Sequence, residues 1–174
     1  GVPFRSSNVT AANEVDAQAA YESQMALWGA LTGGAHLLNH AAGWLHGGLT
    51  ASFEKLILDA EMLQMMDAYF EPMATDPGAL ALDAILEAGA GGHFFGTAHT
   101  MARYEKAFHT PMLSNWDNHP QWLSKGSIDA RSRANTVWKD LLAAHEDPPL
   151  DPGIDEALTA YVTRRKAEGG APMN

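Results

Sequence analysis

The sequence predicts an α/β fold whose later part is mostly helical. Strand-like and helix-like segments alternate over residues 1–70, and only helical patterns follow. Such alternation is typical of a parallel sheet covered by helices. Hydrophobic residues make up 46% of the 174 positions, which excludes a disordered chain and leaves room for one core.

The first elements are predicted to be a strand, a helix and a second strand. Residues 2–6 change from apolar to polar and are followed by Ser-Ser-Asn, which favours a short strand. Apolar residues then recur every three or four positions over residues 17–31, which predicts a helix closed by a glycine pair. Residues 35–41 have the pattern of a buried strand, and residues 43–50 that of a loop.

The remaining elements are predicted to be helices. Ser52 is a good N-cap for a helix over residues 53–70, and two apolar stripes on it predict a mostly buried helix. Residues 111–126 are expected to be irregular, and Ser127 to cap the helix after them. The other expected helices cover residues 80–88, 97–108, 128–145 and 155–168, before a frayed tail. We divide the chain into residues 1–126, with the strands, and residues 127–174, with the C-terminal helices and tail.

Composition narrows the classes of function. Eleven Lys and Arg against 21 Asp and Glu give a net charge of -10, which disfavours nucleic acid as a partner. The absence of cysteine excludes disulfides, thiolate zinc sites and cysteine nucleophiles, and it fits a reducing compartment, so we expect a cytoplasmic protein. No apolar run approaches the roughly 20 residues of a membrane helix, so no membrane partner is expected.

The uncharged segment GAHLLNHAAGWLHGG, residues 34–48, is the strongest candidate site. It contains His36, His40 and His46 around Trp44. A zinc protease motif needs a glutamate after its first histidine, and Leu-Leu-Asn stands there instead. We therefore predict no metal site, with a histidine-ligated metal enzyme as the weakest hypothesis, and we interpret His36 as a hydrogen-bonded core residue.

Two further segments carry candidate residues, each with an alternative left open. Arg5, followed by two serines and Asn8, has the composition of an anion clamp, or it is an ordinary solvated arginine. His93 and Phe95 follow a glycine-rich turn, and they belong to the site only if this loop reaches the cavity of Trp44. The turn lacks the lysine of a phosphate loop, and no G-x-S-x-G elbow is present.

Two strands alone do not form a stable parallel sheet, because such sheets need several strands covered on both faces. The chain also opens on GVPFRSS, which has the pattern of a strand already under way. We therefore expect either that the chain is a fragment lacking the rest of its sheet, or that it assembles as a homo-oligomer.

Four stretches together resemble the trimethylamine methyltransferase family, which includes glycine betaine methyltransferases. They are GVPFRSS, DAQAAYESQMALWGALTGGAHLLNHAAGWLHGGLTASFEKLILDAEML, LDAILEAGAGGHFFGTAHTMARY and RSRANTVWKDLL. The resemblance covers about residues 1–145. It implies the C-terminal part of a longer TIM (β/α)8 barrel. It also implies transfer of a methyl group from a tertiary or quaternary amine to Co(I) of a separate corrinoid protein, in methylamine metabolism and methanogenesis.

The resemblance also implies roles for the candidate residues. The exit of the strand at residues 35–41 would face the substrate. Trp44 would hold the ammonium by cation–π attraction. Arg5, His40 and His46 would bind a carboxylate, and the two histidines are the catalytic candidates. The substrate-binding candidates are Arg5, Asn8, Trp44, His93 and Phe95.

The resemblance implies no directly bound cofactor, because the corrinoid belongs to the partner protein. Every residue is a standard one, so the chain is similar to the branch without pyrrolysine, whose substrates are quaternary amines. Gly43, Gly92 and Asp59 also match the family pattern, and they are interpreted as serving backbone turns and helix packing. The alternative is a non-catalytic helical module for interaction or oligomerisation.

Overall fold

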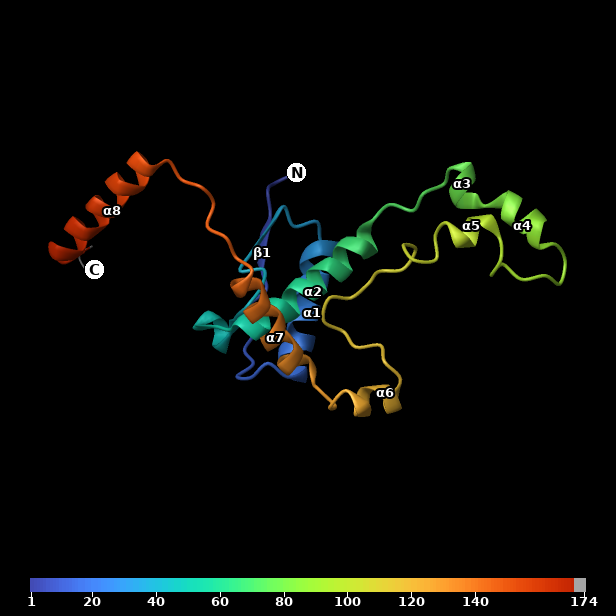
Figure 1. Ribbon diagram of the computed structural model, residues 1–174, viewed down its shortest axis with the longest axis horizontal. Helices are drawn as coiled ribbons and strands as arrows, with labels where there is room; N and C mark the ends of the chain where they lie inside the picture. Colours follow the sequence, from blue (N-terminus) through green and yellow to red (C-terminus); the bar gives the residue numbers. More distant parts are fainter. Residues whose placement is uncertain (171–174) are drawn as a thin grey trace. The chain divides into compact units, whose positions relative to one another are not determined.

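The computed structural model describes residues 1–170, which are mostly helical with a few short strands (Figure 1). The chain divides into two compact units, one of which is Gly1–Asp140 while the other begins at Leu141. This division falls inside a helix, whereas the predicted domain boundary follows residue 126. The domain boundary after residue 126 stays a prediction.

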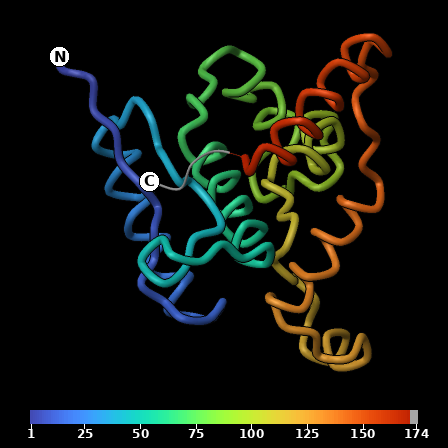
Figure 2. The backbone as a smooth tube through the Cα atoms, turned by 90° about the vertical axis from the view of Figure 1, so that its left-hand side faces the viewer, coloured from blue at the N-terminus to red at the C-terminus, as the bar shows by residue number. Residues whose placement is uncertain are grey.

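The two predicted strands are present and pair with each other. Strand β1 (Arg5–Ser7) runs beside and parallel to β2 (Leu37–Asn39) (Figure 2). In this pairing Arg5 stands opposite Leu37. Both strands are shorter than predicted, and β1 begins later than residue 2. Pro3 has no N–H to donate to a ladder, and the N–H of Phe4 goes to a side chain, His36 Nδ1.

Helix α1 (Ala17–Thr32) follows β1 and confirms the predicted first helix. It begins at Asp16, whose carboxylate accepts hydrogen bonds from the N–H groups of Gln18 and Ala19. It ends at Gly33, the first of the predicted glycine pair. The connection from α1 then returns the chain beside β1, where β2 forms.

The predicted loop over residues 43–50 is a small hairpin instead. Strand β3 (Trp44–Leu45) pairs antiparallel with β4 (Thr50–Ala51), and the short 3-10 turn η1 (His46–Gly48) joins them. His46 and Gly47 both have positive φ, 54° and 65°. The hairpin leaves little trace in the sequence, because its strands are only two residues long and its turn consists of one histidine and two glycines.

Helix α2 (Phe53–Phe70) begins after Ser52, whose hydroxyl accepts a hydrogen bond from the N–H of Lys55, as predicted. It packs against α1 through a cluster of Leu27, Met62 and Met66 (Figure 1). The expectation of a mostly buried helix is right only for its first part, because Tyr69 near its end is 64% exposed. The buried face also contains charged residues that the stripe pattern did not reveal.

The helices after α2 depart more from prediction. The expected helix over residues 80–88 is broken at Ala81, whose φ is 54°, and the expected helix over residues 97–108 is helical for one turn only. The expected irregular segment contains a helix with a capping box at Asn118. The elements are α3 (Pro77–Leu80), α4 (Leu82–Ala88), α5 (Ala98–Met101) and α6 (His119–Ser124).

Two longer helices complete the described chain. Helix α7 (Ala130–Ala143) begins later than predicted, and Asp129, not Ser127, accepts a hydrogen bond from its first turn, at the N–H of Ser132. Helix α8 (Pro152–Ala167) begins at Asp151 and belongs to the second unit. The predicted tail lies largely outside the described residues. No helix within residues 1–170 is both long and apolar enough to cross a membrane.

Candidate functional site

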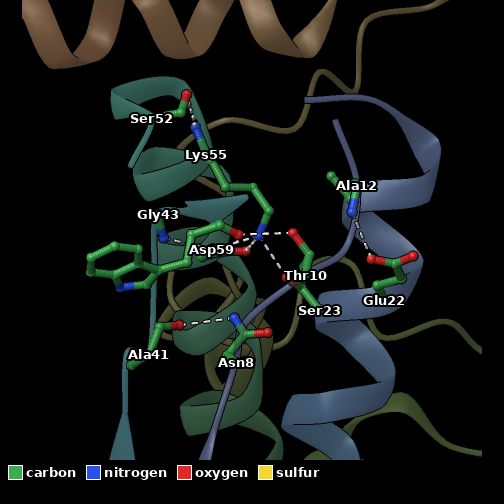
Figure 3. Close-up of polar contacts among 12 residues, drawn as sticks. Asn8, Thr10, Ala12, Glu22, Ser23, Ala41, Gly43, Ser52, Lys55 and Asp59 are labelled. Carbon is green, nitrogen blue, oxygen red and sulfur yellow. Dashed lines mark hydrogen bonds and ion pairs between the residues drawn. The ribbon is translucent and has the colours of Figure 1, made fainter. Parts of the chain in front are cut away.

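Three fully buried side chains hold the backbone of residues 41–44, which we call the 41–44 turn. Asn8 Nδ2 donates to the carbonyl of Ala41 at 2.9 Å, and Thr10 Oγ1 donates to the carbonyl of Trp44 at 2.8 Å. Asp59 Oδ2 accepts from the N–H of Gly43 at 2.9 Å (Figure 3). These side chains come from the segment after β1 and from α2, so long-range contacts fix the turn.

Asp59 is itself held by a buried ion pair. Lys55 Nζ lies 2.6 Å from Asp59 Oδ2 and donates to Ser23 Oγ of α1 at 2.6 Å (Figure 3). Lys55 and Asp59 are both 0% exposed, and they lie one helical turn apart on α2. Asp59 and Gly43 therefore serve the backbone turn and helix packing, as the sequence analysis proposed for them.

Trp44 presents an aromatic face next to a small pocket. The indole is half-buried and meets the His40 ring edge-on, with the ring centroids 5.6 Å apart. The pocket has a volume of about 220 Å³, and it is lined by Ala42, Gly43, Trp44, Ala51, Ser52, Phe53 and Leu56. An indole face is the strongest aromatic partner for a quaternary ammonium ion. The lining residue Phe53 was missed by the sequence analysis.

His40 stands where the two parallel strands end. It directly follows β2, has a φ of 49°, and its Nδ1 lies 3.3 Å from the hydroxyl of Ser7, the last residue of β1. The carboxyl ends of both strands therefore meet at Ser7, His40 and Trp44. His40 is exposed, so its imidazole is open to a ligand at this end of the sheet.

His46 makes two hydrogen bonds within the protein. Its Nδ1 lies 2.7 Å from the hydroxyl of Thr50, and its Nε2 lies 3.1 Å from the carbonyl of Asn13. Because a carbonyl only accepts, a neutral ring with its proton on Nε2 satisfies both contacts. One ring nitrogen thus closes the hairpin, and the other ties the hairpin to the segment before α1. The assignment of His46 as a catalytic residue stays a prediction.

Arg5, Asn8 and His36 differ in position or burial from what the sequence predicted. Arg5 opens β1 instead of ending it and is exposed. Asn8 is 0% exposed and directs its Nδ2 to the 41–44 turn, while its Oδ1 has no partner within residues 1–170. His36 is hydrogen-bonded as predicted, but it is exposed and not part of the core. Their positions leave Trp44 and His40 as the central pair.

His93 and Phe95 line a different pocket from Trp44. Their pocket has a volume of about 970 Å³ and is lined by Gly92, His93, Phe94, Phe95, Thr100, Met101, Tyr104 and Phe108. No residue is shared between the two linings. The structure therefore does not bring His93 and Phe95 to Trp44, and their binding role stays a prediction.

Glu54, at the start of α2, has a lowered pKa. Hydrogen bonds from Asn135 Nδ2 and Trp138 Nε1 of α7, at 2.7 and 2.9 Å, lower the pKa of Glu54 to about 2. The carboxylate therefore ties α2 to α7 next to the hairpin. Within residues 1–170, no three histidine, aspartate or glutamate side chains gather closely enough to hold a metal ion.

Comparison with known proteins identifies the family to which the chain belongs. The trimethylamine methyltransferase (MTTB) family model matches residues 1–170, so the chain belongs to this family. A glycine betaine methyltransferase of Desulfitobacterium hafniense is 37% identical over 171 residues, which are 98% of this chain and 36% of the relative. The trimethylamine methyltransferase MttB2 of Methanosarcina mazei is 29% identical over 149 residues, 86% of this chain and 30% of the relative.

The trimethylamine methyltransferase MttB of Desulfitobacterium hafniense is 26% identical over 155 residues, 89% of this chain and 31% of the relative. The chain thus spans about a third of the length of the curated relatives that it matches. Family membership confirms the resemblance stated from the sequence. It gives no support to the alternative of a non-catalytic interaction or oligomerisation module.

Proposed function

We propose that this chain forms part of a methyltransferase that takes a methyl group from a quaternary amine of the glycine betaine type. The observation that carries the proposal is the Trp44 indole, placed beside a small pocket and in contact with His40 where two parallel strands end. The family and the higher identity to a glycine betaine methyltransferase support the same substrate class.

The proposed role of each side chain follows from its chemistry. The indole face of Trp44 attracts the positive trimethylammonium group, by roughly 0.5–2 kcal/mol. His40 donates a hydrogen bond to the carboxylate of a betaine. These two contacts orient the substrate, and the walls of the pocket keep water away from its methyl groups. We propose no protein nucleophile, because the methyl acceptor attacks the carbon directly.

The acceptor is proposed to be the Co(I) form of a corrinoid carried by a partner protein, with no cofactor bound to this chain. The cobalt would donate an electron pair to the methyl carbon and form a cobalt–carbon bond, while the methyl carbon–nitrogen bond breaks with its electron pair on nitrogen. The demethylated amine would leave with a neutral tertiary nitrogen and its carboxylate unchanged. We further propose that β1 and β2 are late strands of a TIM (β/α)8 barrel, that the complete protein is a cytoplasmic homo-oligomer, and that it works in methylamine metabolism.

The proposal is tested by methyl transfer from glycine betaine to cob(I)alamin, catalysed by the complete protein and followed by the change in corrin absorbance. Trp44→Ala should weaken betaine binding about tenfold, measured by calorimetry, because the cation loses its aromatic face. Trp28→Ala is the matched control, since Trp28 lies on α1 against Tyr69. Unchanged affinity in the Trp44 variant would overturn the proposed site.

A further inference from the structure

We propose that Asp59 and Thr10 are positioning residues that set the place of the Trp44 indole, and that Lys55 balances the buried charge of Asp59. This inference rests on the proposed function, because it assigns to the buried ion pair a role in amine recognition. None of the three residues touches the pocket beside Trp44. Each would act through the backbone of the 41–44 turn.

The contacts bracket Trp44 on both sides. Asp59 Oδ2 accepts the N–H of the preceding Gly43, and Thr10 Oγ1 donates to the carbonyl of Trp44 itself. Gly43 has a φ of 91°, and a Cβ at this position would lie 3.4 Å from the Cβ of Leu56. The turn is therefore pressed against α2, and its orientation is fixed by hydrogen bonds from residues distant in sequence.

Packing of the 41–44 turn against α2 does not by itself require the Lys55–Asp59 ion pair. A buried pair can often be replaced by apolar side chains of similar size without loss of stability, because burial of two charges is costly. Apolar replacements would fill the space but leave the Gly43 N–H without an acceptor. What the carboxylate adds is an oxygen at a fixed point: Lys55 contacts both oxygens, and Oδ2 also accepts from Gly43.

Two double variants separate positioning from packing. Lys55→Met with Asp59→Leu removes both charges and the acceptor for Gly43, whereas Lys55→Met with Asp59→Asn removes both charges but keeps an acceptor oxygen. Both are made in the complete protein with 5-fluorotryptophan incorporated, and the Trp44 fluorine signal is assigned with Trp44→Phe. Urea unfolding, the fluorine spectrum and calorimetry with glycine betaine are measured for each.

We expect the Leu variant to shift or broaden the Trp44 fluorine signal and to bind betaine about tenfold more weakly, since small displacements of a binding group are costly. The Asn variant should keep the wild-type signal and stay within about twofold in affinity. Thr10→Val, which removes the bond on the other side of Trp44 and leaves the ion pair intact, should also move the signal. The Thr10→Val variant therefore tests the inference even if a double variant fails to fold.

A Trp44 signal that is unchanged in the Leu and Val variants, or that moves equally in the Leu and Asn variants, would overturn the inference. The fluorine spectrum is recorded without amine, so it tests positioning even if the wild-type protein does not bind betaine. Lack of betaine binding by the wild type would refute the proposed function alone.

Discussion

Trp44 owes its position to its backbone neighbours, and its ring is left free for other contacts. The carbonyl of Trp44 and the N–H of Gly43 are both bonded by buried side chains, while the indole lies perpendicular to the His40 ring and lines the pocket. Fixing the backbone while leaving the ring half-exposed is suited to a residue that must meet a ligand. His46, two residues later, differs from Trp44. It is exposed, but both of its ring nitrogens are hydrogen-bonded within the protein.

His46→Ala is expected to lower the free energy of unfolding by about 1–2 kcal/mol, because it removes one hydrogen bond within the hairpin and one from the hairpin to Asn13. Chemical denaturation of the wild type and the variant measures this difference. We expect the pH profile of methyl transfer to keep its shape. Loss of one limb of that profile in the variant would instead show that His46 acts on the substrate.

Helix α2 is the element that joins the candidate site to the rest of the first unit. Its start carries Glu54, which bonds to α7, and Lys55 and Asp59, which reach α1 and the 41–44 turn. Farther along, the carboxylate of Glu61 accepts hydrogen bonds from the N–H groups of Leu113 and Ser114. Charged side chains on different sides of α2 thus connect it to segments far away in sequence.

Glu54→Gln should lower stability by about 1 kcal/mol at neutral pH, a modest value because the carboxylate is partly exposed and screened by solvent. The pKa of Glu54 is lowered from 4.5 to about 2 in the folded protein by the hydrogen bonds of Asn135 and Trp138. Its contribution is therefore fully present above pH about 4.5 and is lost as the pH falls toward about 2.

Unfolding free energies of the wild type and Glu54→Gln, measured from pH 7 to pH 2.5, check this expectation. The difference between them should shrink below pH about 4.5. Trp138→Phe is the matched variant, since it removes one of the two donors to Glu54 and should show a smaller difference over the same pH range. A difference independent of pH would contradict the assignment.

At the scale of the whole molecule, the two-stranded parallel sheet leaves apolar side chains uncovered. Leu37 of β2 is 56% exposed and Val2, which precedes β1, is 85% exposed. Parallel strands are normally covered on both faces and flanked by further strands. The chain of 174 residues therefore has an apolar surface around its sheet that favours association.

We expect residues 1–174, expressed alone, to run in light scattering as a species larger than the 18.7 kDa monomer. Leu37→Lys should reduce this association, because it puts a charge beside the sheet. Leu82→Lys, at an exposed position on α4, should not. A monomer at every protein concentration would contradict the expectation.

Local signals were sufficient for part of this structure. Ser52 caps α2 and the first of two glycines ends α1, as predicted, because capping depends on residues within a few positions of each other. The Lys55–Asp59 spacing of one helical turn was also present in an apolar helix, although its meaning was missed. Asp129 took the cap expected of Ser127, because α7 begins at Ala130, directly after Asp129.

The sequence by itself determined the family, the two parallel strands, the first helices and the choice of the segment around Trp44 as the candidate site. Only the tertiary structure decided that Asn8 supports a backbone turn, that His46 closes a hairpin, and that His93 and Phe95 line another pocket. The physical reason is distance along the chain. A cap or a stripe is set by neighbours within one or two helical turns. The bonds from Asn8 and Thr10 to the 41–44 turn instead join residues 33 and 34 positions apart, which no local pattern records.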